Sequence, residues 1–136
     1  RGTNRCHIAR AALESIAFQA NDVIRAMEAD SGTAMHSVRV DGGASANNFL
    51  CQFLADITGM EVERPRCIES TALGAAYMAG LTVGFWSGED DLADNWALDR
   101  RFVPSMDEAE RRRHTDGWDH AVRCARLWSA TDNSQR

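Results

Sequence analysis

The sequence predicts an α/β fold that is rich in helices and has few, short parallel strands. Its 136 residues allow one domain, and 44% of them are hydrophobic, which is enough to build a core. Long stretches place apolar residues three and four positions apart, as amphipathic helices do. Two short apolar segments flank one such stretch, and a strand–helix–strand unit of this kind is normally parallel and right-handed.

The first helix is expected over residues 4–29, because apolar residues form a continuous stripe there. Thr3 is the candidate N-cap, and Ser31-Gly32 ends the pattern. A strand is expected over residues 37–40, where valines alternate with other residues. This strand leads directly into Asp41-Gly42-Gly43.

The second helix is expected to begin near Ala44 and to close at Gly59. Residues 60–64 predict a second strand, which Pro65 stops. Parallel strands normally belong to larger sheets that are covered on both faces. We therefore expect further strands upstream of Arg1, and unpaired edges on the two strands predicted here.

Three more helices are predicted in the remaining sequence. Small residues over positions 70–81 would let a helix lie close against a neighbouring element. Capping-box spacing predicts helix starts at Ser87 and Ser105, with a short extended segment over residues 98–103 between them. The last helix carries an apolar face, and all four tryptophans are expected to anchor the core: Trp86, Trp96, Trp118 and Trp128.

Composition excludes several classes of protein. The 15 cationic side chains are all arginine and are outnumbered by 20 acidic ones, so a nucleic-acid surface is not expected. The lack of lysine excludes Schiff-base chemistry and a P-loop lysine. No apolar run approaches about 18 residues, so no membrane span is predicted. Four scattered cysteines are typical of a reducing cytosol, which predicts a cytoplasmic location: Cys6, Cys51, Cys67 and Cys124.

The strongest signal for chemistry is the turn that runs from Asp41 through Gly42 and Gly43 to Asn47. Glycines permit positive φ and let a ligand approach the backbone. The first N–H groups of the following helix would lack partners and would suit a phosphate. Asn47 would offer a donor and an acceptor to a ribose or base. The alternative is an ordinary tight turn in which Asp41 satisfies local amides.

Other groups of residues predict no site. The four histidines lack metal-ligand spacing and are expected on the surface. Arg111-Arg112-Arg113 lies among acidic residues, which predicts a solvated charged face. We therefore nominate no catalytic residue and no metal ligand.

Four stretches of the sequence carry a further signal: residues 1–5 with 7–14, residues 40–44 with 47–50, residues 69–76 and residues 83–86. Together they resemble the C-terminal part of the FGGY carbohydrate kinases. The second stretch is similar to the adenosine-binding motif of this family, and the last favours members that phosphorylate glycerol over pentulose kinases. The resemblance covers nearly all 136 residues.

The resemblance implies the C-terminal portion of a ribonuclease-H-like, actin-like ATPase domain over residues 1–136. It implies that ATP binds with Mg²⁺ held largely by an upstream part, and that the γ-phosphate passes to glycerol. Gly43 would present its amide to the phosphates, Gly42 would allow the close approach, and Asn47 would contact the adenosine. The substrate domain and the general base would lie upstream, so this chain alone is expected to be inactive. A homo-oligomer is expected for the whole enzyme.

Two alternatives remain open at this point. One is a part of another FGGY sugar or polyol kinase, and the other is a non-catalytic helical interaction module. In some members of the family, the segment equivalent to Pro104–Arg113 docks a phosphotransferase-system regulator, and Glu110 matches a zinc ligand shared with it. The three consecutive arginines beside Glu110 depart from that pattern.

Overall fold

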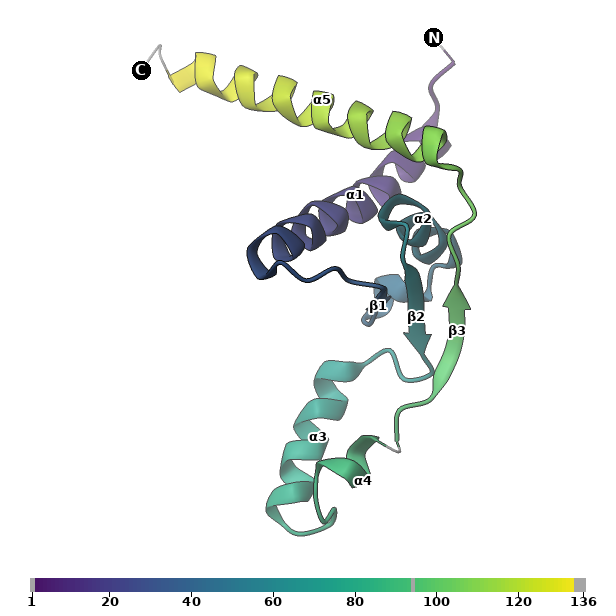
Figure 1. Ribbon diagram of the computed structural model, residues 1–136, viewed down its shortest axis with the longest axis vertical. Coiled ribbons are helices and arrows are strands. Elements are labelled where there is room, and N and C mark those ends of the chain that lie inside the picture. Colours follow the sequence, from purple (N-terminus) through teal and green to yellow (C-terminus); the bar gives the residue numbers. More distant parts are fainter. Residues whose placement is uncertain (1, 94, 134–136) are drawn as a thin grey trace.

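The computed structural model describes residues 2–93 and 95–133. One helix lies against a small sheet and a second helix packs on the first, a long C-terminal helix crosses beside them, and a helical hairpin extends away from the sheet (Figure 1). The elements are α1 (Arg5–Ser31), β1 (Ser37–Arg39), η1 (Gly43–Ala46), α2 (Asn48–Thr58), β2 (Glu61–Pro65), α3 (Ser70–Thr82), α4 (Glu89–Ala93), β3 (Leu98–Phe102) and α5 (Glu108–Asn133).

The three strands form one mixed sheet in the order β1-β2-β3. Strand β1 is parallel to β2, with Val38 opposite Val62, so the predicted parallel unit is confirmed. Strand β3 is antiparallel to β2, with Phe102 opposite Val62. The expectation of two strands with unpaired edges was therefore wrong for β2, which is central, because the extended segment after residue 97 is a full strand. Within the described residues, the outer edge of β1 has no strand partner.

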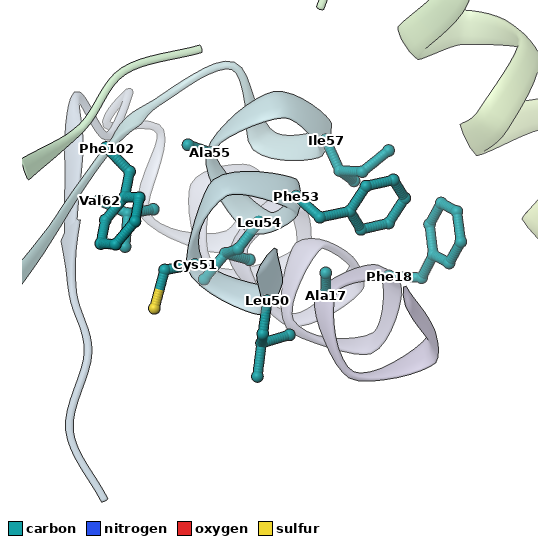
Figure 2. Close-up of a cluster of buried hydrophobic side chains, with 10 residues drawn as sticks. All are labelled: Ala17, Phe18, Leu50, Cys51, Phe53, Leu54, Ala55, Ile57, Val62 and Phe102. Carbon is teal, nitrogen blue, oxygen red and sulfur yellow. The ribbon is translucent and has the colours of Figure 1, made fainter. Parts of the chain in front are cut away.

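The core lies between α1, α2 and the sheet (Figure 2). Helix α2 supplies most of it, since its apolar residues face both α1 and the strands. Phe18 and Phe53 meet edge to face with ring centroids 5.5 Å apart, a favoured geometry for aromatic pairs. On the other side of α2, Val62 and Phe102 are almost completely buried. Burial of these apolar side chains is the main force that holds α2 on the sheet and α1 on α2.

The expectation that all four tryptophans anchor the core is confirmed for Trp118 and wrong for the others, since Trp86 packs on Tyr77 of α3 and the remaining two are exposed. Trp118 is half-buried, stacks on Phe18 at 5.2 Å and donates a hydrogen bond to Asp22. Trp128 is 81% exposed and Trp96 is 39% exposed. The last helix therefore uses the first part of its apolar face for packing, and phenylalanines fill the centre instead.

Three helix starts differ from the predicted ones. The N-cap of α1 is Asn4 and not Thr3, because the Asn4 side chain accepts from the N–H groups of Cys6 and His7. Helix α2 begins at Asn48 because the residues after the glycines form the short 3₁₀ helix η1. Helix α5 begins after Asp107, whose carboxylate accepts from the N–H of Glu110.

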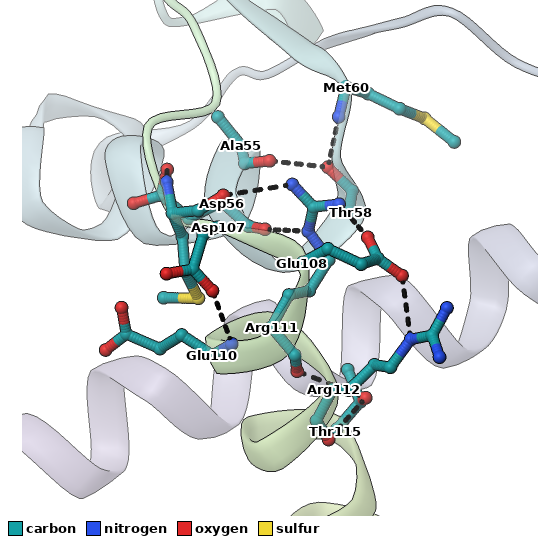
Figure 3. Close-up of polar contacts among 11 residues, drawn as sticks. Ala55, Asp56, Thr58, Met60, Asp107, Glu108, Glu110, Arg111, Arg112 and Thr115 are labelled. Atoms are coloured by element: carbon teal, nitrogen blue, oxygen red, sulfur yellow. Dashed lines mark hydrogen bonds and ion pairs between the residues drawn. The ribbon is translucent and has the colours of Figure 1, made fainter.

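Arg111 ties α5 to the end of α2 (Figure 3). Its Nε donates to the carbonyl oxygen of Asp56 at 2.6 Å, and its Nη1 lies 3.0 Å from the Glu108 carboxylate. Arg112 and Arg113 are exposed and pair with glutamates of their own helix. The predicted solvated face is thus confirmed for these two arginines and wrong for Arg111, whose side chain is only 23% exposed.

The hairpin of α3 and α4 lies away from the core. Small residues permit close packing at one point, Gly80, where a Cβ would collide with the ring of Trp86. Most of the other small residues of α3 are exposed. In the described ranges, no helix combines the length and the apolar character needed to cross a membrane.

Candidate functional site

The candidate site is the turn that follows β1. The N–H of Val40 still donates to the carbonyl of Glu63 on β2, at 3.0 Å, and the chain leaves the sheet directly afterwards. Gly42 has φ +77°, a backbone conformation that favours glycine strongly. Its N–H donates to the carbonyl of Ile68 at 2.6 Å, which fixes the turn against the segment before α3.

The next residues form η1 and are held from inside. The N–H and the hydroxyl of Ser45 both donate to the carbonyl of Gly42, at 3.0 and 2.7 Å. Among the described residues, the N–H groups of Gly43 and Ala44 have no hydrogen-bond acceptor. Gly43 is exposed, and a Cβ placed on it would meet no atom within 4 Å. Two adjacent backbone N–H groups are therefore left open, without an acceptor, an arrangement that suits an anion.

Asn47 is the N-cap of α2 rather than a residue of its first turn. Its Oδ1 accepts from the N–H groups of Phe49 and Leu50, at 2.9 and 3.3 Å. The helix N-terminus is therefore already capped, and the open amides belong to η1 instead. Because Oδ1 is engaged, the exposed carboxamide of Asn47 has its Nδ2 group left to offer to a ligand.

Asp41 does not play the part that the tight-turn interpretation gave it. Its carboxylate accepts from the hydroxyl of Ser70 and does not cap the local amides. This contact joins the end of β1 to the start of α3. A cleft of about 770 Å³ opens beside it, between the sheet and the α3–α4 hairpin, and is lined by residues that include Arg39, Tyr77 and Trp96.

Arg64 is a neighbour of the candidate site that sequence reasoning missed. Its guanidinium reaches from β2 to the carbonyl oxygens of Ser45 and Ala46, at 2.9 and 3.3 Å. The buried thiol of Cys51 lies 3.2 Å from the same Ser45 oxygen. Burial raises the pKa of this thiol, and the nearby Arg64 charge opposes the shift. The sequence does show an arginine inside a predicted strand, but residue spacing does not predict which backbone carbonyls its side chain contacts.

The other candidates stay outside the site. His114 packs against both Phe18 and Phe53 and is half-buried, so the expected surface position was wrong for it. His7 completes the capping box of α1. All four cysteines are free. In the part of the chain that the structure describes, no group of three or more His, Cys, Asp or Glu side chains is arranged to hold a metal ion.

The fold is thus α/β, and its candidate site is a strand–turn–helix unit in which two backbone N–H groups lack partners. The sequence model of the FGGY family of carbohydrate kinases, C-terminal domain, matches residues 1–83. The chain therefore belongs to the FGGY family of carbohydrate kinases.

Relatives of high similarity are glycerol kinases. The chain is 56% identical over 131 residues to the glycerol kinase of Paraburkholderia phytofirmans and 58% identical over 130 residues to that of Symbiobacterium thermophilum. Each match covers 96% of this chain and 26% of the relative. The chain thus spans about a quarter of the length of these relatives.

Solved structures confirm the predicted fold class. The Plasmodium falciparum glycerol kinase with ADP aligns with a TM-score of 0.75 and 39% identity, covering 90% of this chain and 24% of that one. The xylulose kinase of Lactobacillus acidophilus aligns with a TM-score of 0.70 over 99% of this chain and 28% of its own, and at 19% identity it shows the fold alone.

Proposed function

We propose that this chain is the C-terminal, ATP-binding portion of a glycerol kinase, which transfers the γ-phosphate of ATP to glycerol and forms glycerol 3-phosphate. The observation that carries the proposal is the pair of open amides at Gly43 and Ala44, within a chain 56% identical to glycerol kinases. The solved relative with the higher identity among those described above contains ADP, which supports a nucleotide as the ligand.

The turn would act on the nucleotide through donors. The amide of Gly43, with that of Ala44 beside it, would donate to phosphate oxygens, and Gly42 would let the phosphates come close to the backbone. Nδ2 of Asn47 would donate to an acceptor on the adenosine. These groups are preorganised by the hydrogen bonds of the turn, so they bind without further ordering of the chain.

Magnesium, which the family implies, is not assigned to these residues. It requires several oxygen ligands in octahedral geometry. Within the described turn, Asp41 supplies the one carboxylate, and Ser70 already donates to it. The residues at the turn therefore do not fit a magnesium site, and we assign its ligands to the upstream part of the kinase.

Residues 1–136 would then form one wall of the nucleotide cleft. The glycerol pocket and the general base would belong to the upstream substrate domain, and we nominate no catalytic residue here. Four free thiols support a reducing, cytoplasmic setting for the kinase. A homo-oligomer remains a prediction, which sedimentation of the whole kinase would test.

A hybrid kinase tests the proposal. The part of the Paraburkholderia phytofirmans glycerol kinase that lies upstream of the match is joined to this chain, and glycerol phosphorylation is measured with ATP and Mg²⁺. We expect the hybrid to be active and the upstream part alone to be inactive. The matched control joins this chain to the upstream part of the Lactobacillus acidophilus xylulose kinase. An inactive, folded glycerol kinase hybrid would overturn the proposal and would favour a non-catalytic interaction module.

A further inference from the structure

Arg64 connects three elements through one guanidinium group. Beyond its two carbonyl contacts on η1, Nη1 lies 2.9 Å from Oδ1 of Asn48 at the start of α2. Its Nε and Nη2 lie 2.8 and 2.7 Å from Asp99 on β3. The side chain is only 12% exposed, and the guanidinium carbon lies 5.4 Å from the centre of the Phe102 ring.

This arrangement fixes the position of the open amides. Ser45 and Ala46, whose carbonyls Arg64 holds, lie between Gly43 and Asn47 in the sequence. Asp99 binds Nε and Nη2 on one edge of the planar guanidinium group, and this orients Nη1 toward the carbonyls of the turn. Without this contact, the carbonyl of Ala46 would lose its charged donor, and η1 would be held by its internal bonds and the Cys51 thiol.

We propose that Arg64 is a positioning residue for the nucleotide, which sets nucleotide affinity by holding the turn from Gly43 to Asn47 in its binding geometry. This inference rests on the function proposed above. Arg64 does not reach the open face of the turn itself, because its donors are directed at the backbone carbonyls and Asp99. It therefore acts through the amides, and displacement of a preorganised donor by a fraction of its contact distance weakens binding.

Arg101 provides a matched control on the same pair of strands. Its Nη2 donates to Glu63 at 2.7 Å, and its Nε lies 3.5 Å from Glu61. It thus links β2 to β3 by ion pairs, as Arg64 does, but makes no contact with η1. Arg101→Met removes a cross-strand arginine and leaves the turn as it is.

The experiment is steady-state kinetics of the hybrid kinase with ATP varied at saturating glycerol. We expect Arg64→Met to raise KM for ATP about tenfold while kcat changes by less than about twofold. Arg64→Lys, which keeps the charge but offers a single ammonium group, should raise KM by about threefold. Arg101→Met should leave both constants within about twofold of those of the unsubstituted hybrid.

The outcomes separate the two proposals. An inactive unsubstituted hybrid overturns the proposed function and this inference with it. If the unsubstituted hybrid is active and KM for ATP stays unchanged in Arg64→Met, the positioning role alone is wrong. An equal rise in KM in Arg101→Met would also overturn it, since general weakening of the sheet would then explain both results. If Arg64→Met does not fold, Arg64→Lys decides, because an unchanged KM in that variant contradicts the proposal.

Discussion

The carboxylate of Asp56 holds the segment before α5 by accepting a hydrogen bond of 2.6 Å from the N–H of Ser105. The same oxygen accepts from the hydroxyl of Ser105 at 3.1 Å and from the N–H of Met106 at 3.2 Å. Gln52, one turn earlier on α2, donates to it as well. Asp56 is 8% exposed, so this buried charge is satisfied by four donors and fixes where α5 starts relative to α2.

We expect Asp56→Ala to lower the free energy of unfolding by about 1–3 kcal/mol, because it leaves the partly buried N–H groups of Ser105 and Met106 without their acceptor. Asp56→Asn keeps an acceptor oxygen and should cost about half as much. Urea denaturation followed by circular dichroism measures both. Asp116→Ala, at an exposed position of α5, is the matched control and should change stability by less than about 0.5 kcal/mol. Equal losses in the two alanine variants would contradict the anchoring role.

Glu63 should make stability depend on pH. The hydrogen bond from Arg101 holds the pKa of Glu63 below its ordinary value, burial partly opposes this, and the charges of Arg101 and Arg39 add to the lowering. The unfolded chain therefore takes up the proton at higher pH than the folded chain does. The contribution of Glu63 is complete above the ordinary glutamate pKa of about 4.3 and is lost as pH falls through the lower folded pKa.

Glu63→Gln should accordingly flatten the decline in the free energy of unfolding between about pH 5 and pH 3. Urea denaturation at a series of pH values measures this slope. Arg101→Met should flatten the same region, since it removes the main cause of the lowered pKa. A slope that is unchanged in both variants would show that the ion pair does not form in solution.

Cys51 should be the unreactive thiol. It is 1% exposed and its pKa is raised by burial, whereas Cys6, Cys67 and Cys124 are exposed. Because the thiolate is the nucleophile, iodoacetamide should modify three cysteines of the native chain and the fourth after addition of urea. Peptide mass spectrometry identifies the sites. Labelling of Cys51 at the rate of the other three would show that the packing around η1 opens readily.

Sequence patterns predicted the elements well and the connections between them less well. The helix of residues 5–31 and the parallel unit follow from periodicity, and the helix of residues 70–82 follows from its small residues, both of which are local properties. A glycine pair followed by alanines and serine predicts a helix start, which would place Asn47 inside the helix. A 3₁₀ turn has the same composition, and in the structure this turn forms first, so Asn47 is the N-cap of α2.

Contacts between distant positions had no local signal. The pairing of β3 with β2 and the reach of Arg64 to η1 depend on how the chain closes in space. The turn from Gly42 to Asn47 is predicted as the candidate site because glycine permits positive φ and because the first N–H groups of a helix lack partners. Their role in binding ATP remains a proposal.

Gly43 and Gly42 should respond differently to substitution. At Gly43 a side chain meets no protein atom within 4 Å, so Gly43→Val should fold normally but fill the space in front of the amides. In the hybrid kinase we expect kcat/KM for ATP to fall. The corresponding loss of transition-state stabilisation should be about 2–3 kcal/mol, comparable to the loss of one preorganised donor. At Gly42, with φ +77°, Gly42→Ala should instead lower the free energy of unfolding by about 1–2 kcal/mol. Unchanged kinetics in Gly43→Val would show that the turn is structural only.

The 136-residue chain alone should not phosphorylate glycerol. Phosphoryl transfer depends on bringing the acceptor hydroxyl, the magnesium and the γ-phosphate together, and positioning supplies most of the rate. This chain offers amides and an asparagine from one wall, and in the described turn its one carboxylate, Asp41, is engaged by Ser70. With half of the contacts missing, ATP affinity should be millimolar or weaker, about −4 kcal/mol. A coupled assay with millimolar ATP, magnesium and glycerol tests this. Turnover above buffer that disappears in Asp41→Asn would mean that the chemistry lies within these 136 residues, because a base at the end of β1 would then be at work.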